Sequence, residues 1–299
     1  MNLAREIARS LQLPELYVLA VARSASHRYK VFTIRKADGK SDRVIEQPSK
    51  SLKLLQKWIA RRIFAQLPTH PAAHAYIEGR SIATNAAVHR ESRYISRLDF
   101  KDFFPSLTSG DIGSLVRSAQ VSVGDSVLDD EDIHVVCQLV CRFGRLAIGA
   151  PCSPAISNKL LFDIDTRLAR VADSSNALYT RYADDLYFSS SRADVLFNLC
   201  KEAQKVIVNT PSPKLTINAS KTYHASRKRR MVVTALRITP DAKVSVGREL
   251  KRKIRAVAHK AQTNQLAAND LAWLQGMLAY VFSIEPEYAH RIRSKYQLG

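Results

Sequence analysis

Three aspartates of this sequence stand where carboxylates could carry out chemistry. Asp99 directly follows residues 94–98, an alternating apolar segment that is typical of a strand. Asp184 and Asp185 lie at the centre of residues 178–189, where two short aromatic-containing runs predict a hairpin with the acidic pair at its tip. If the strand that ends at Asp99 lies beside this hairpin, the three carboxylates converge. Hard oxygen ligands of this kind suit Mg²⁺, which keeps positions open for phosphate oxygens.

A convergent acidic site would perform a specific reaction. Two Mg²⁺ ions about 3.5–4 Å apart would activate a nucleophilic hydroxyl and stabilise a departing pyrophosphate in an in-line displacement. An Asp–Asp pair by itself is more often an ordinary turn, because Asp tolerates turn geometry. The rest of the chain decides between these two interpretations.

Three motifs, in the same order along the chain, resemble the palm motifs of reverse transcriptases. They are Tyr182-Ala183-Asp184-Asp185, similar to the family's aromatic-x-Asp-Asp box; residues 99–106 (DFKDFFPS), similar to its first carboxylate motif; and residues 149–158 (GAPCSPAISN), similar to the palm motif between those two. Each motif alone is a weak or moderate signal, whereas the three together are specific. The resemblance extends from about Tyr29 into the C-terminal region and implies an RNA-directed DNA polymerase.

The resemblance implies a catalytic set and a nucleotide pocket at the matching positions. The catalytic residues are Asp99, Asp184, Asp185 and Lys221, and the ligands of two Mg²⁺ ions are Asp99, Phe100, Asp184 and Asp185. Lys221 would protonate the departing pyrophosphate as a general acid, and an ordinary surface lysine is the alternative. The positions expected to bind the incoming dNTP are Arg43, Lys36, Asp102, Phe103, Phe104 and Gly149.

Within this pocket the residues would have different roles. Arg43 is expected to grip the triphosphate through its planar guanidinium, with Lys36 as the second choice. Phe104 is expected to lie under the incoming sugar, where its ring would clash with a 2′-hydroxyl and favour deoxynucleotides. Gly149 would let the backbone approach the template–nucleotide pair closely. The alternatives are a solvated basic hairpin for the two cations and a core aromatic for Phe104.

Two further motifs resemble those of retron reverse transcriptases. They are Asn85-Ala86-Ala87-Val88-His89, similar to an Asn-Ala-x-x-His motif, and Val233-Thr234-Ala235, similar to a Val-Thr-Gly signature with Ala in place of Gly. The resemblance implies an enzyme that recognises its own structured noncoding RNA, primes from a guanosine 2′-hydroxyl and makes branched msDNA. It also implies anti-phage defence together with an effector protein. The predicted RNA contacts are Asn85, His89, Thr234, Arg252 and Arg255; for the first two, a helix cap and a structural histidine are the alternatives.

Composition and charge fit a folded protein that binds a polyanion. The 299 residues include 46 Lys and Arg against 27 Asp and Glu, which gives a formal net charge of +19. Basic residues cluster at 227–230 and 248–255, and next to a polymerase palm we expect them to follow a nucleic-acid backbone. No apolar stretch predicts a membrane span or signal peptide, and the four cysteines fit neither a disulfide framework nor a zinc site. We therefore expect a soluble intracellular protein, and the resemblance to retron reverse transcriptases implies the bacterial cytoplasm.

The elements that position these residues predict an α+β fold. Helical spacing is found in residues 2–24, 52–67, 112–120, 131–143 and 155–171 and from 245 onward, and strand-like patterns in residues 29–34, 43–46, 94–100, 178–181, 186–189 and 231–238. The resemblance implies a right-hand polymerase with an all-helical C-terminal thumb. Its expected parts are an N-terminal helical segment 1–28, fingers 29–74 and 107–150, palm 75–106 and 151–237, and thumb 238–299.

Two alternative functions compete with the retron interpretation. One is another bacterial reverse transcriptase, either group II intron-like or of the abortive-infection type. The other is a non-catalytic RNA-binding protein on a polymerase scaffold. The presence of all three carboxylates favours an enzyme over the second alternative.

Overall fold

A four-stranded antiparallel sheet lies at the centre of the molecule. The computed structural model describes residues 3–35, 39, 42–263 and 267–298. The strand order in this sheet is β10-β3-β9-β8. The strands are β3 (Tyr94–Asp99), β8 (Leu178–Tyr182), β9 (Asp185–Ser190) and β10 (Tyr223–Ser226). The predicted hairpin and its neighbouring strand are therefore confirmed.

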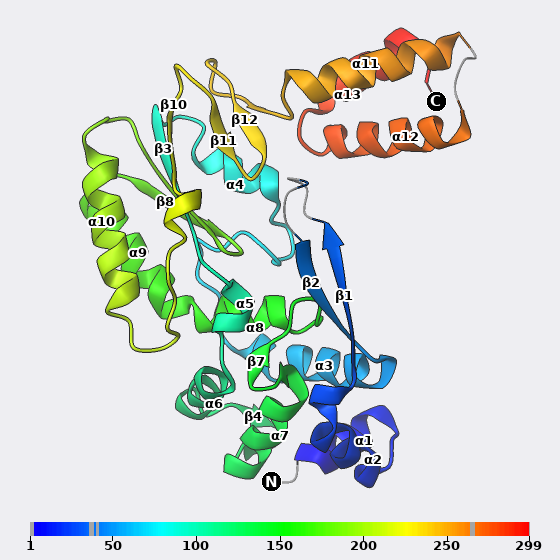
Figure 1. Ribbon diagram of the computed structural model, residues 1–299, viewed down its shortest axis with the longest axis vertical. Helices are drawn as coiled ribbons and strands as arrows, with labels where there is room; N and C mark the ends of the chain where they lie inside the picture. Colours follow the sequence, from blue (N-terminus) through cyan, green and yellow to red (C-terminus); the bar gives the residue numbers. More distant parts are fainter. Residues whose placement is uncertain (1–2, 36–38, 40–41, 264–266, 299) are drawn as a thin grey trace.

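The two faces of this sheet pack against different elements. Helices α9 (Phe162–Ser174) and α10 (Val195–Val208) lie side by side against the sheet (Figure 1). Leu186 and Phe188 of β9 join the main core on that face. Because side chains alternate along a strand, Tyr187 points to the opposite face. There it packs with α4 (Ile82–Val88) and with the hairpin of β11 (Met231–Val233) and β12 (Leu236–Ile238).

The N-terminal half surrounds the main core with helices and small hairpins. Its elements are α1 (Leu3–Leu11), α2 (Glu15–Arg23), η1 (Ala25–His27), β1 (Tyr29–Arg35), β2 (Asp42–Pro48), α3 (Lys50–Arg62), η2 (Phe64–Gln66), α5 (Phe103–Ser106), α6 (Ser109–Ser118), β4 (Ser122–Val123), β5 (Ser126–Val127), α7 (Asp130–Val140), β6 (Cys141–Arg142), β7 (Arg145–Leu146) and α8 (Ser153–Leu160). Residues from α1 to α10 contribute to this one core. The predicted β1–β2 hairpin is confirmed.

The C-terminal helices have a core of their own. The remaining elements are η3 (Ala219–Lys221), β13 (Val244–Ser245), α11 (Arg248–Gln262), α12 (Ala268–Phe282) and α13 (Pro286–Tyr296). Ile254, Leu278 and Ile292, one from each helix, belong to this separate cluster of buried residues. Figure 1 shows the three helices at one end of the molecule and α1–α2 at the other. The α+β class with a helical C-terminal lobe is confirmed, whereas the domain boundaries within it stay predictions.

Several details differ from the predicted elements; for example, α4 and β10 were not predicted. Residues 231–238 form two strands joined by a turn at Thr234 and Ala235, not one strand. Residues 155–171 fall in two helices, α8 and α9, that meet at Leu161. Helix α10 was not predicted, although its buried side chains have helical spacing. In the described part of the chain, no helix is long and apolar enough to cross a membrane.

Candidate active site

The sheet brings the three aspartates together. In the register of β3 with β9, Asp99 lies directly opposite Asp185. Asp184 precedes Asp185 in the two-residue turn that joins β8 to β9. Its backbone carbonyl accepts a hydrogen bond of 3.0 Å from the Phe100 N–H, next to Asp99. Ala183 precedes Asp184 with a positive φ of 57°, which permits the tight reversal. The predicted placement of these carboxylates at neighbouring strand ends is therefore confirmed.

Lys221 reaches this site from the next segment of chain. Its Nζ lies 2.9 Å from Oδ1 and 3.2 Å from Oδ2 of Asp99. Asn218 fixes the approach, because its N–H donates to the Asp99 carbonyl at 2.8 Å. The Asp99 side chain is 5% exposed and that of Lys221 is 47% exposed. The lysine is therefore paired with the Asp99 carboxylate rather than being an isolated surface residue.

The Asp185 carboxylate contacts one side chain from β3 and one from β9. Its Oδ1 lies 3.5 Å from Nε of Arg97, and its Oδ2 accepts a hydrogen bond of 3.1 Å from the Tyr187 hydroxyl. Burial raises the pKa of Asp185 to about 6; the charges of Asp184 and Asp99 add to the rise, and Arg97 opposes it. Sequence reasoning missed Arg97 and Tyr187, although strand alternation places both on the face of Asp185.

Asp184 shares this crowded environment. Burial raises its pKa, and the Asp99 charge adds to that effect, whereas Lys221 and Arg43 oppose it. Neighbouring carboxylates that resist ionisation form a site where a divalent cation would relieve the repulsion. The donor set therefore suits Mg²⁺ chemically.

The predicted convergence of all three carboxylates on one metal position is not found in this structure. Within the ranges that the structure describes, no group of three or more His, Cys, Asp or Glu side chains is gathered closely enough to hold a metal ion. Asp99 is bound to Lys221, and Asp185 to Arg97 and Tyr187. The Phe100 ring stacks on Phe103 with centroids 5.7 Å apart, so only the backbone of Phe100 could contribute a ligand.

The predicted nucleotide-binding residues that the structure describes lie on β2, at the start of α5 and at Gly149. Arg43 is exposed on β2, close enough for its charge to act on Asp184. Asp102 is exposed with a positive φ of 46°, and Phe103 is buried. Phe104 is half-buried, with its ring centroid 5.2 Å from that of Phe103. Lys36 lies outside the described residues.

Gly149 lies against strand β2. A Cβ at this position would lie 3.1 Å from the Glu46 carbonyl oxygen and 3.1 Å from Cγ2 of Ile45, both on β2, and φ is +114°. The Glu46 N–H donates to the Ile148 carbonyl at 2.7 Å. The close approach that requires glycine in this structure is to strand β2, which carries Arg43. Gly149 is also exposed, and its contact with a nucleotide stays a prediction.

Two of the predicted RNA contacts are wrong for this structure. Asn85 and His89 are both 0% exposed, so neither side chain can touch RNA. His89 lies 2.7 Å from the hydroxyls of Ser189 and Thr180 through its two ring nitrogens. It is the structural histidine given above as the alternative.

The other three predicted contacts differ in accessibility. Thr234 is half-buried, and its hydroxyl donates to the Ile82 carbonyl at 2.9 Å. Arg252 and Arg255 are exposed on α11. Of this group, only the two arginines have side chains open to a large ligand.

A strongly basic pocket lies beside the N-terminus of α11. Its cavity is about 390 Å³, and its lining includes seven cations and no carboxylate. The cationic residues are Arg227, Lys228, Arg229, Arg230, Arg237, Arg248 and Lys251. Such a surface favours phosphate-rich ligands, and we refer to these residues as the basic pocket.

A buried ion pair supports the turn formed by Ala183 and Asp184. The guanidinium of Arg181 is 0% exposed, pairs with Asp165 at 2.7 Å, and also bonds Asn158 at 3.0 Å. The same group donates to the Ala183 carbonyl at 3.2 Å, next to Asp184. No sequence signal distinguishes this arginine, because a strand arginine is usually exposed.

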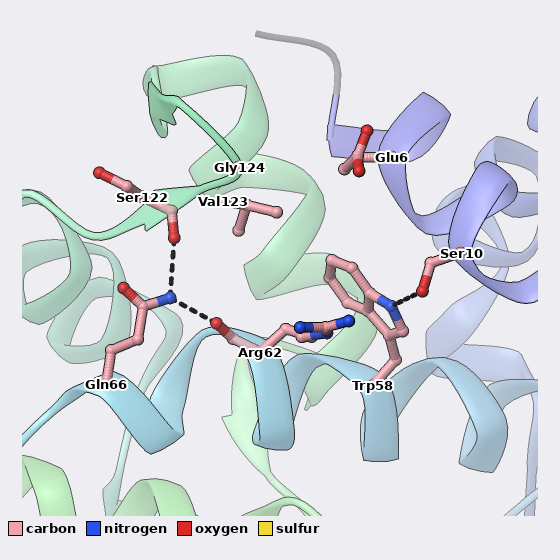
Figure 2. Close-up of a pocket in the computed structure, with 8 residues that line it drawn as sticks. All are labelled: Glu6, Ser10, Trp58, Arg62, Gln66, Ser122, Val123 and Gly124. Atoms are coloured by element: carbon pink, nitrogen blue, oxygen red, sulfur yellow. Dashed lines mark hydrogen bonds between the residues drawn. The ribbon is translucent and has the colours of Figure 1, made fainter.

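Another pocket belongs to a different part of the molecule. A cavity of about 420 Å³ lies between α1, α3 and the β4–β5 turn, and the Trp58 indole donates to the Ser10 hydroxyl at 2.7 Å. Figure 2 shows the residues that line it. None of the residues that line it was predicted to be functional. The acidic site therefore remains the candidate active site.

Comparisons with known proteins agree with the motifs. Residues 34–236 match the family model described as reverse transcriptase (RNA-dependent DNA polymerase). The retron Ec83 reverse transcriptase of Escherichia coli is 30% identical over 292 residues, which cover 95% of this chain and 91% of that protein. The retron Ec86 reverse transcriptase of Escherichia coli is 30% identical over 293 residues, covering 98% and 88%. Among solved structures, a truncated apo telomerase from Candida tropicalis aligns with a TM-score of 0.49 and 14% identity over 71% of this chain and 53% of that one.

Proposed function

Because this chain belongs to the retron reverse transcriptases and is thus an RNA-directed DNA polymerase, we propose that it copies part of its own structured noncoding RNA into branched msDNA. Priming would start from a 2′-hydroxyl of that RNA. The observation that carries the proposal is the likeness to retron enzymes over nearly the whole chain, together with the pairing of Asp99 and Asp185 beside Asp184. Anti-phage defence with an effector protein, in the bacterial cytoplasm, is part of the same proposal.

The acidic site would supply the chemistry. Asp99, Asp184 and Asp185 would hold two Mg²⁺ ions, with the Phe100 backbone as a further ligand. These ions would activate the attacking hydroxyl and stabilise the departing pyrophosphate. Lys221 is bound to Asp99 and would exchange that carboxylate for the pyrophosphate, to which its Nζ would deliver a proton.

The nucleotide would bind between β2 and the start of α5. Arg43 would contact the triphosphate from β2, in a position set by the contact of that strand with Gly149. Phe104 would lie under the sugar and exclude a 2′-hydroxyl, and Phe103 supports its ring from behind. Asp102, exposed at the start of α5, would line the same pocket.

The RNA and the RNA–DNA product would lie along the basic C-terminal part. The basic pocket, Arg252 and Arg255 present cations to the phosphate backbone. Contacts of this kind hold a nucleic acid in place without reading its sequence. Shape and 2′-hydroxyl contacts would provide the recognition of a folded RNA.

The test is to express the gene together with its upstream flanking DNA and to examine the small nucleic acids of the cell. We expect a multicopy species in which DNA is joined to RNA through a 2′,5′ linkage, absent when Asp185→Asn is expressed from the same DNA. DNA synthesis without a branch would instead indicate another kind of bacterial reverse transcriptase. Absence of any synthesis by the purified wild-type protein would indicate an RNA-binding protein.

A further inference from the structure

The side-chain hydroxyl of Tyr187 links a catalytic carboxylate to a distant turn. It donates to Oδ2 of Asp185 at 3.1 Å and accepts the backbone N–H of Thr234, also at 3.1 Å. Both hydrogen-bonding functions of the hydroxyl are therefore used, and its orientation is fixed from two sides. One end of this connection is the proposed metal site, and the other is the Val233-Thr234-Ala235 turn.

The position of Tyr187 excludes a direct role toward the substrates. The residue is 1% exposed, and its ring packs in the cluster that contains Ile95, Met231 and Leu236. A side chain in this position cannot reach a nucleotide or an RNA strand. It can act on the reaction only through Asp185.

The turn that supports Tyr187 is itself anchored. Thr234 and Ala235 both have positive φ, 47° and 65°, which produces a tight connection between β11 and β12. The Thr234 hydroxyl donates to the carbonyl of Ile82 at the start of α4. Thr234, whose backbone N–H donates to the Tyr187 hydroxyl, is thus hydrogen-bonded both to α4 and to β9.

Helix α4 is tied to the same strands by its other end. His89, which follows this helix, lies 2.7 Å from Ser189 on β9 and 2.7 Å from Thr180 on β8. These are the two strands that the catalytic turn joins. Residues of both motifs that resemble retron signatures therefore contact the strands behind the carboxylates.

We infer that Tyr187 is a positioning residue that fixes the carboxylate of Asp185 for metal binding, and that the Thr234 turn acts through it rather than on RNA. With Oδ2 held by the hydroxyl and Oδ1 beside Arg97, the carboxylate has one defined orientation. Loss of the hydroxyl frees this carboxylate to rotate, so that metal binding must then order it. The inference rests on the polymerase activity of the family and not on the branched product.

The experiment compares Tyr187→Phe with Tyr179→Phe. Tyr179 is a matched control, because it is also buried, on the adjacent strand, and its hydroxyl donates to Asp165 at 2.7 Å rather than to a catalytic carboxylate. For each full-length protein, the thermal midpoint is followed as MgCl₂ is added without nucleotide, which reports metal binding directly. Primer extension on poly(rA)·oligo(dT) with dTTP is then measured across the same Mg²⁺ range.

For Tyr187→Phe we expect the Mg²⁺ concentration at half-effect to rise roughly tenfold in both assays, the size expected for one hydrogen bond to a charged group. Extension at saturating Mg²⁺ and affinity for the homopolymer duplex should stay within about twofold to threefold of wild type. Tyr179→Phe should lower the thermal midpoint without changing the Mg²⁺ concentration at half-effect. An unchanged Mg²⁺ requirement in Tyr187→Phe, or an equal change in both variants, would overturn the inference.

A second variant covers the case in which Tyr187→Phe does not fold. Thr234→Val removes the hydroxyl that donates to Ile82 and leaves the side-chain shape nearly unchanged. It should raise the Mg²⁺ requirement in the same direction by a smaller factor, with the affinity for duplex unchanged. Weakened duplex binding with an unchanged Mg²⁺ requirement would show that Thr234 acts on RNA and would overturn the inference.

Discussion

Asp185 is more easily protonated than an ordinary surface aspartate, because burial raises its pKa to about 6 from the usual 3.8. The folded metal-free protein therefore binds more protons at this residue than the unfolded chain does, and its stability falls as pH rises through this range. A divalent cation on the ionised carboxylates would reverse the loss. We expect Mg²⁺ to raise the thermal midpoint more at pH 7 than at pH 5. An equal rise at both pH values, or an undiminished difference in Asp185→Asn, would contradict this.

Phe104 is the residue on which sugar selection depends in this account. Its half-buried ring lies against that of Phe103 at the start of α5. Phe104→Ala should therefore admit nucleotides with a 2′-hydroxyl and lower the ratio of kcat/KM for dTTP to that for UTP by at least about tenfold. The measurement is single-nucleotide extension on poly(rA). An unchanged ratio in a folded, active variant would show that Phe104 is only a core aromatic.

At the scale of single residues, the sequence identified the clustered aspartates but not every side chain that contacts them. Asp99, Asp184 and Asp185 stand out because acids are scarce in this chain and these lie at strand ends. Arg181 carries no such signal, since only the fold shows that its guanidinium is buried against the catalytic turn. For His89, a motif identifies the residue, but it does not show whether the ring points to RNA or into the core. The structure places the ring in the core.

Strand β2 is held in place by its contact with Gly149. A methyl group at this position would lie 3.1 Å from backbone and side-chain atoms of β2, and φ of +114° is unfavourable for any other residue. Gly149→Ala should therefore displace β2 and raise the KM for dNTP several-fold. The affinity for the template–primer duplex should change less. Gly110→Ala is the control, because its Cβ would meet only Thr108 Oγ1 at 3.6 Å. An equal KM for dNTP in the two variants would show that the contact between Gly149 and β2 does not set the position of Arg43 for nucleotide binding.

At the scale of elements, turn chemistry explains which predictions failed. The hairpin of β8 and β9 was predicted because aromatic runs flank the acidic pair. The β11–β12 turn was read as continuous strand, since neither Thr234 nor Ala235 is a usual turn residue, although both adopt positive φ. Helix α10 is different, because Leu196, Leu199 and Ala203 have the helical spacing that predicts a helix from sequence alone.

At the scale of the whole molecule, the chain has a formal net charge of +19. In the basic pocket, no carboxylate lies among the lining residues to neutralise the cations. Affinity for RNA should therefore fall by roughly 10³ between about 50 and 200 mM salt, as counterions compete for the phosphates. Arg229→Gln should make the logarithmic salt dependence shallower by about one unit. Lys201→Gln, on α10, removes the same charge outside the basic pocket and should leave the slope unchanged. A flat salt response of the wild-type protein would contradict phosphate contacts by this surface.

The arrangement of the whole chain was predictable to the level of class. The order of motifs implied a polymerase, and the helical pattern from residue 245 onward indicated a separate lobe, which has its own core. The sequence could not show that the N-terminal helices share one core with the central sheet, because those contacts join residues far apart in the chain. Nor could it show that Lys221 and Arg97 would each pair with a catalytic carboxylate.

The most direct test of the account is RNA-templated dNTP incorporation by Asp184→Asn and Asp185→Asn, measured beside RNA affinity in the same preparations. Asn keeps the size of the side chain but lacks the negative charge that a divalent cation requires. We predict that both variants bind RNA within about threefold of wild type, since the phosphate contacts lie elsewhere, and that neither incorporates detectable dNTP. Incorporation at a wild-type rate by either variant would contradict the assignment of this acidic site as the catalytic centre.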